Sequence, residues 1–280
     1  MDKTQPKKRK FSPLLIALGI LAVCIVPGLD QRMVVRQYTE ETEEITHPVR
    51  LVLVTDLHSC KYGEGEQKLL DAIDELQPDL LLLGGDIFDD VQPNNNTEAF
   101  LAGISGKYPA YYVTGNHEYW AGGAAFEEKM DILSRYEITR LAGTSETIEI
   151  SGETLTVCGV DDPAVSLVDA SHGFEEQLAN VAPDETSYSI LLSHRPERFA
   201  AYAESGFDLT LCGHAHGGQV RIPGILNGLW APDQGFFPNL AGGRYEEDGS
   251  VMIVSRGLAR ESTRVPRVYN RPELVVVDLT

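Results

Sequence analysis

The chain has 280 residues, of which 42% are hydrophobic, and its formal net charge is −19 at pH 7. This length and composition are typical of one large packed domain or two small ones, and they exclude a disordered protein. The acidic balance argues against binding to nucleic acids, because a negative surface repels their phosphate backbones. The 4 cysteines form no CxxC pair, so they predict neither a disulfide framework nor a zinc cluster.

The first 29 residues differ from all that follow. Residues 1–10 form a basic tail, and residues 11–29, FSPLLIALGILAVCIVPGL, carry no charge. This run is close to the roughly 20 residues that an apolar helix needs to cross a bilayer. We therefore predict a cytoplasmic tail over 1–10 and a single transmembrane anchor over 11–29, which places the rest of the chain outside the cytoplasm. The alternative is a signal segment that is cleaved on export.

Residues 30–48 are polar and acidic, which suits a linker in the form of a short stalk or a solvated first strand. From Val49 onward, apolar runs typical of strands alternate with helical patterns, and we assign 49–280 to one α/β domain. Strands separated by helices predict βαβ units and a mostly parallel, buried sheet. The predicted helices cover 66–77 and 97–104, and the predicted strands cover 49–55, 80–84, 111–115, 147–150, 154–160, 188–194, 208–214, 251–255 and 273–279.

Side chains of metal-binding types follow five of these strands. In open α/β sheets the carboxyl ends of parallel strands line the ligand crevice, so we expect these side chains to converge there. In an extended backbone, both imidazoles of a His-x-His pair would also point to one side of the strand. The residues are Asp56 and His58; Asp86 and Asp89; Asn116, His117 and Glu118; His194; and His214 and His216.

Carboxylate and amide oxygens mixed with imidazole suit manganese, iron or zinc better than calcium, whose sites are nearly all oxygen. The set is also larger than a single ion needs. It therefore predicts two ions that share a bridging carboxylate, an arrangement that chiefly serves in-line displacement at phosphorus.

In chain order, the segments DLH, GDIFD, GNHE, SH and GHAH resemble the pattern of the calcineurin-like metallophosphoesterase superfamily, which is DxH, GDxxD, GNH[DE], H and GHxH. The match runs from residue 56 to residue 216. The segments GHAHGGQVRIPG and SRGLARESTRVPRVYNRPEL are similar to the bacterial branch of membrane-anchored or exported phosphodiesterases. The resemblance implies a four-layer α/β/β/α sandwich with two divalent metal ions, with manganese as the first choice and zinc or iron as alternatives.

Carried over residue by residue, the resemblance also implies roles for the side chains. His117 would stabilise phosphoryl oxygens or protonate the leaving group, Glu118 would orient His117, and Asp89 would support the ligands without binding metal. A basic group near the metals could hold a second phosphate of the substrate, with surface ion pairing as the alternative; the candidates are Arg221, Arg267 and Arg271. The implied ligands are Asp56, His58 and His216 for one ion, Asn116, His194 and His214 for the other, and Asp86 as the bridge.

The resemblance thus implies a phosphoesterase that hydrolyses phosphodiester or pyrophosphate bonds by means of a hydroxide between its two metals. The predicted anchor favours a substrate of the membrane or envelope, such as a lipid-linked or cell-wall phosphoester. The alternatives are a phosphomonoesterase, including a protein phosphatase, and a metal-containing binding module without turnover. A binding module would require a lost ligand or a lost His117, and the sequence shows neither loss.

Overall fold

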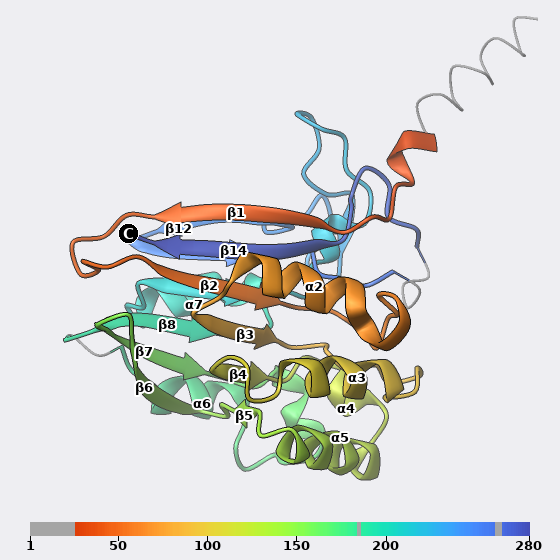
Figure 1. Cartoon of the computed structure of the whole chain (residues 1–280). Helices are drawn as coiled ribbons and strands as arrows, with labels where there is room; N and C mark the ends of the chain where they lie inside the picture. Colours follow the sequence, from red (N-terminus) through yellow and green to blue (C-terminus); the bar gives the residue numbers. More distant parts are fainter. Residues whose placement is uncertain (1–25, 184–185, 261–264) are drawn as a thin grey trace, which may run out of the picture.

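The computed structural model describes residues 26–183, 186–260 and 265–280, which form two six-stranded β-sheets with helices on their outer faces (Figure 1). One hydrophobic core lies between the two sheets, and one further core lies between each sheet and its helices. The predicted α/β fold is therefore confirmed, and its layers run in the order helices, sheet, sheet, helices.

The first sheet has the strand order β1, β14, β2, β3, β4, β5. Neighbouring strands run parallel except β14 and β2, which run antiparallel. Helices α2 (Gln67–Leu76), α3 (Asn95–Ile104) and α5 (Gly123–Arg135) pack on its outer face. Its strands are β1 (Val34–Glu40), β14 (Glu273–Leu279), β2 (Val49–Val54), β3 (Leu80–Gly84), β4 (Ala110–Val113) and β5 (Thr139–Arg140).

The second sheet has the strand order β12, β13, β9, β8, β7, β6. Its four central strands are parallel, and both outer strands pair antiparallel to their neighbours. Helices α6 (Phe174–Asn180) and α7 (Phe199–Glu204) cover its outer face. Its strands are β12 (Gly243–Glu247), β13 (Ser250–Val254), β9 (Leu209–Cys212), β8 (Tyr188–Leu192), β7 (Glu153–Gly159) and β6 (Thr144–Ile150).

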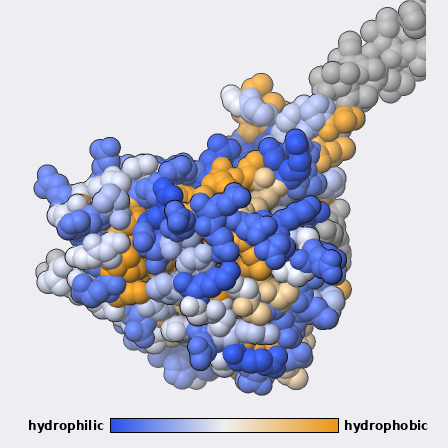
Figure 2. All heavy atoms as spheres, viewed as in Figure 1, coloured by the Kyte–Doolittle hydropathy of each residue, from blue (hydrophilic) through white to orange (hydrophobic). Residues whose placement is uncertain are grey.

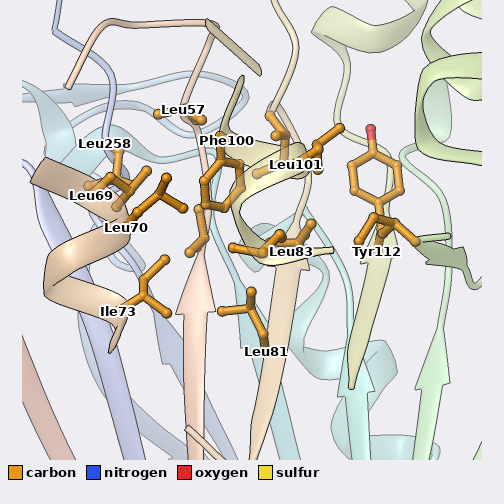
Figure 3. Close-up of a cluster of buried hydrophobic side chains, with 14 of the residues drawn as sticks. Leu57, Leu69, Leu70, Ile73, Leu81, Leu83, Phe100, Leu101, Tyr112 and Leu258 are labelled. Carbon is orange, nitrogen blue, oxygen red and sulfur yellow. The ribbon is translucent and has the colours of Figure 1, made fainter. Parts of the chain in front are cut away.

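The central strands are apolar on both faces, which explains their nearly continuous hydrophobic runs. In β3, Leu80 and Leu82 pack into the core between the sheets, whereas Leu81 and Leu83 pack against the helices. Figure 3 shows the helix side of this arrangement, where side chains of α2 and α3, among them Leu70 and Phe100, gather with Leu81 and Leu83.

Short elements follow several strands at the end of the sheets where the predicted ligands lie. They are the one-turn helix α4 (His117–Trp120), the 3-10 helices η1 (Glu64–Glu66), η2 (Pro163–Leu167), η3 (Pro196–Arg198) and η4 (His216–Gly218), and a small hairpin of β10 (Trp230–Ala231) and β11 (Gly235–Phe236). The segment between η4 and β13 lacks a long periodic pattern, so its short strands are not predicted from the sequence.

Part of the 30–48 segment forms a strand, which is one of the two forms expected for it. Residues 34–40 form β1, which pairs in parallel with β14 and closes one edge of the first sheet. The folded unit thus includes part of the 30–48 segment, as the solvated first strand rather than as a stalk. Most of the predicted anchor, together with the basic tail, lies outside the described residues. Among the residues that are described, no helix combines the length and the apolar character needed to span a membrane.

Leu211 of β9 offers a test of the core between the sheets, because its side chain has no exposed surface. Leu211→Ala leaves a cavity that the paired strands cannot close, so the free energy of unfolding should fall by about 2 to 5 kcal/mol. Urea denaturation followed by circular dichroism measures this loss. The control Val91→Ala, at a position that is 80% exposed, should change it by less than about 0.5 kcal/mol. Equal effects at the two positions would contradict this packing.

Candidate metal centre

The predicted ligands come from both sheets. Asp56 follows β2, Asp86 follows β3 and Asn116 follows β4, all in the first sheet, whereas His194 follows β8 and His214 follows β9 in the second. From the sequence, we expected the ligands to meet in one crevice at the edge of a single open sheet. The structure instead forms the site where the carboxyl ends of strands from two packed sheets meet.

The ligand atoms gather in two groups. Asp56, His58 and His216 offer three atoms within 4.8 Å of one another, and Asp86, His194 and His214 offer three more. Oδ2 of Asp86 lies 3.2 Å from Nε2 of His194 and 3.5 Å from Nε2 of His58, so this one oxygen faces both groups. These two groups contain six of the seven predicted ligands, and the assignment of each ligand to one ion, with Asp86 as the bridge, stays a prediction.

Five buried atoms in this cluster have no hydrogen-bond partner among the described residues: Oδ2 of Asp56, Nε2 of His58, Oδ2 of Asp86, Oδ1 of Asn116 and Nδ1 of His216. Buried polar atoms without partners are unfavourable and uncommon, so a cluster of them requires a cause. Carboxylate oxygens, an amide oxygen and imidazole nitrogens can all donate a lone pair to a divalent cation. The residues present therefore fit two metal ions.

Burial and charge set the protonation of the imidazoles. Burial lowers the pKa of His194, but the carboxylates of Asp86 and Asp56 outweigh it and raise the pKa to about 10. Burial lowers the pKa of His216 well below its usual value, and the neighbouring His58 and Arg267 lower it further. His216 is thus neutral, the form that binds metal, whereas a cation at His194 would take the place of a proton.

The backbone is left-handed at five of the seven predicted ligands, which is unfavourable for residues other than glycine. The φ angles are 50° at Asp56, 51° at Asp86, 67° at His214 and 47° at His216. The expectation of an extended His-x-His pair is therefore wrong. Because the chain turns sharply here, His214 and His216 join different groups of ligands rather than sharing one face.

Two glycines allow the loops to approach the ligands closely. A Cβ atom on Gly85, whose φ is +88°, would lie 2.6 Å from Nδ1 of His194. On Gly257, whose φ is +71°, it would lie 2.5 Å from Cβ of Asp56. Gly85 belongs to the GDIFD segment, but Gly257 lies more than forty positions beyond the last predicted ligand. Sequence reasoning missed Gly257 because only the fold brings it to Asp56.

Asp89 and Asp90 hold two imidazoles of the site. Nδ1 of His58 lies 3.1 Å from Oδ2 of Asp89, which leaves Nε2 of His58 facing Asp86. Nδ1 of His117 lies 2.6 Å from Oδ1 of Asp90. Asp90 was absent from the prediction, although the doubled acid in GDIFDD was a signal for it. The side chain of His117 is 21% exposed, more than that of His58 at 2%, so His117 borders the solvent.

Glu118 does not have the contacts expected of a residue that orients His117. Its buried carboxylate accepts hydrogen bonds from the backbone N–H groups of Gly115 at 2.7 Å and of Asp86 and Phe88 at 3.1 Å. Burial raises the pKa of Glu118, and the nearby Asp86 raises it further. Glu118 therefore ties the loop after β3 to the loop after β4, and the carboxylate that orients His117 belongs to Asp90.

A further set of charged residues, which the sequence did not reveal, surrounds His214. Oδ2 of Asp233 lies 2.9 Å from Nε2 of His214, which leaves Nδ1 for a metal. Arg195 contacts the same Asp233 oxygen and donates to Oδ1 of Asp162 at 3.0 Å. Asp233 lies between β10 and β11, so this small hairpin reaches a predicted ligand. No motif in the sequence indicates that Asp233 or Arg195 belongs to the site.

The three candidate arginines have other partners. Arg267 is buried and donates to the backbone carbonyls of Ala259 and Arg256, and Arg271 donates to the carbonyl of Arg32. Arg221 donates to the carbonyl of Gly217 and lines a pocket to which no predicted metal ligand contributes. Their predicted role in holding a second phosphate of the substrate stays a prediction; Arg267 lies close enough to the metal centre for its charge to lower the pKa of His216.

Comparison with known proteins identifies similar sequences. The family model described as calcineurin-like phosphoesterase matches residues 49–218. An uncharacterized metallophosphoesterase of Campylobacter jejuni is 28% identical over 193 residues, which cover 66% of this chain and 49% of that protein. The uncharacterized metallophosphoesterase YkuE of Bacillus subtilis is 25% identical over 237 residues, which cover 82% of this chain and 78% of YkuE. The chain thus spans about half the length of the first relative.

Solved structures show the same fold. The NAD nucleotidase of Haemophilus influenzae superposes with a TM-score of 0.52 at 16% identity, over 76% of this chain and 46% of that one. A 5'-nucleotidase precursor of Thermus thermophilus also gives a TM-score of 0.52, at 13% identity, over 83% of this chain and 54% of that one. At such low identity the likeness concerns the fold alone.

Replacing Asp86 tests the centre directly. Because its oxygen faces both groups, Asp86→Ala should lose both metals, whereas Asp89→Ala should weaken metal binding by about 10- to 100-fold through the freed ring of His58. Elemental analysis and titration with Mn²⁺ measure both effects. Asp131→Ala, at an exposed position on α5, should bind metal as the unmodified chain does. Full metal content in Asp86→Ala would refute the two-ion assignment.

Proposed function

The chain belongs to the calcineurin-like phosphoesterase family, and we propose that it hydrolyses phosphodiester or pyrophosphate bonds with two divalent metal ions, manganese being our first choice. One observation carries the proposal: an oxygen of Asp86 faces both groups of ligand atoms, and five buried atoms of the predicted ligands have no hydrogen-bond partner among the described residues. A site with two ions and a bridging carboxylate suits displacement at phosphorus.

When bound, two divalent ions supply positive charge to a phosphoryl group and increase the acidity of water. Asp56, His58 and His216 would hold one ion. Asn116, His194 and His214 would hold the other, and Asp86 would contact both. The protein fixes these side chains beforehand through Asp89, Asp233 and the backbone contacts of Glu118. Such preorganisation limits the rearrangement needed during the reaction.

His117 is the candidate acid. The hydrogen bond between its Nδ1 and Asp90 fixes the ring and leaves Nε2 for the substrate. A proton on Nε2 can pass to the departing oxygen, or it can remain as a hydrogen bond to a phosphoryl oxygen. The backbone N–H of His117 also donates to Oδ1 of Asp86 at 2.9 Å, which ties the position of this residue to the bridging carboxylate.

The position of Trp120 favours a substrate that carries an organic group next to its phosphate. Its ring centroid lies 4.5 Å from that of His117, and the residue is 55% exposed. An exposed aromatic ring beside the site can pack against an apolar or aromatic part of an ester. This feature favours esters with an organic group over inorganic phosphate compounds, and together with the predicted anchor it leads us to propose a lipid-linked or cell-wall phosphoester.

The reaction class can be tested with the full chain in detergent, loaded with Mn²⁺. We expect faster hydrolysis of bis-p-nitrophenyl phosphate than of p-nitrophenyl phosphate, and loss of both activities with a chelator. Preference for the monoester would instead favour the phosphomonoesterase alternative. Absence of turnover with Mn²⁺, Zn²⁺ and Fe²⁺, despite bound metal, would favour a binding module.

His117→Asn separates proton transfer from metal binding. Both metals should remain, and diesterase activity should fall by about 10²- to 10⁴-fold, as expected for a lost general acid. The loss should be smaller for p-nitrophenyl diesters than for alkyl diesters, because a good leaving group needs less protonation. Elemental analysis and the two rate measurements check this. Equal losses for both leaving groups would assign His117 to the phosphoryl oxygens, and loss of metal would make it a ligand.

We also propose that the domain lies outside the cytoplasm, held by the apolar run of residues 11–29. One test fuses, after Thr280, a reporter enzyme that works only outside the cytoplasm. We expect this reporter to show activity, and we expect the full-length chain to remain with the membrane fraction. A reporter that is active only in the cytoplasm serves as the control and should be silent. Recovery of a shortened product free of the membrane would favour the cleaved signal segment.

A further inference from the structure

A pocket of about 500 Å³ lies beside the loop that follows η4, and no predicted metal ligand lines it. Its polar wall consists of Arg36 on β1, Arg221 in the loop and Arg256 after β13. Its apolar wall includes Ile222 and Ile225. Three arginines in one pocket are unexpected in a chain with a net charge of −19.

The positive charge of these three arginines is only partly compensated, because one carboxylate pairs with them. Within the described part of the chain, all their ion pairs are with Glu273: Arg256 donates to its carboxylate, and Nε of Arg36 lies 4.0 Å from Oε2. Among the described residues, the half-buried Arg221 donates to neutral oxygens alone, the carbonyl of Gly217 at 3.3 Å and the side-chain amide of Asn227. The pocket therefore keeps an excess of positive charge, which an anion would compensate.

The pocket adjoins the point where the apolar N-terminal run enters the domain. The backbone N–H of Tyr269, which lines the pocket, donates to the carbonyl of Gly28 at 2.6 Å. Val26 and Leu29 are 66% and 44% exposed, and Ile222 and Ile225 in the pocket wall are 47% and 83% exposed. Figure 2 shows hydrophobic surface next to the start of the described chain.

We propose that the pocket of Arg36, Arg221 and Arg256 binds a phosphate group, and that its place beside the apolar run makes the ligand an anionic phospholipid headgroup. Guanidinium groups match the paired oxygens of a phosphate and form strong hydrogen bonds with them. The exposed Ile222 and Ile225 would then contact the acyl region next to the headgroup. This site is distinct from the metal centre and does not depend on hydrolysis.

The test uses the full chain in detergent with a chelator, so that phosphate does not bind through metals. One arm measures the melting temperature with inorganic phosphate against chloride at equal ionic strength, since a ligand of the folded state raises it. The other arm counts phosphatidylglycerol and phosphatidylcholine molecules retained in native mass spectrometry. Arg221→Gln should weaken the binding of phosphate and of phosphatidylglycerol by about 10- to 100-fold, the effect of one lost charge-assisted hydrogen bond.

Arg135→Gln is the matched control, because it removes the same charge from α5, where Arg135 pairs with Glu98. It should bind both ligands as the unmodified chain does. If Arg221→Gln fails to fold, Arg36→Gln on the exposed β1 provides the second variant.

Preferential retention of phosphatidylglycerol, lost in the pocket variants alone, would support the proposal. If inorganic phosphate binds but the two lipids are retained equally, the pocket is a phosphate site, and the proposal that its ligand is a lipid headgroup is overturned. Binding of neither ligand, or equal losses in Arg135→Gln, would overturn the site itself. No readout involves turnover, so failure here and failure of the proposed reaction are separate results.

Discussion

The constraint on which the site depends is the burial of carboxylates where the two sheets meet. Asp56, Asp86 and Asp89 are all at most 4% exposed, and within the described part of the chain their ion pairs are with imidazoles. Charge buried in this way is unfavourable unless opposite charge is close. Two divalent cations would supply that charge, and they would also account for the five buried ligand atoms that have no hydrogen-bond partner among the described residues.

Buried strands hold the short, strained loops that carry the ligands, and this keeps the carboxylates close together. The strands are buried on both faces, so their ends are fixed, and most of the ligands follow closely in left-handed turns. Glycines such as Gly257 allow the neighbouring chain to pass against the ligands. Strained backbone of this kind persists only where the surrounding structure holds it, which here means hydrogen bonds to the carboxylates of Glu118, Asp89 and Asp233. The stability of the sheets thus supports the geometry of the site.

Charge is distributed unevenly over the molecule. The chain is acidic overall, yet a cluster of arginines gathers beside the start of the described chain, in a pocket that no predicted metal ligand lines. In the picture that we propose, positive charge appears in two forms: as bound cations where the phosphoryl group reacts, and as guanidinium groups where the domain faces lipid. The segment between η4 and β13 contributes to both places, with Asp233 at His214 and Arg221 in the pocket.

The sequence by itself determined the α/β class, the main strands and the positions of the predicted ligands, because strand periodicity and the motif at each strand end are local patterns. Only the tertiary structure decided that the ligands come from two sheets, that Asp90 rather than Glu118 holds His117, and that Arg221 faces a separate pocket. These features depend on contacts between residues far apart in the chain, such as Asp233 with His214 or Gly257 with Asp56. Such contacts leave no periodic signal in a single sequence, since packing of the two sheets creates them.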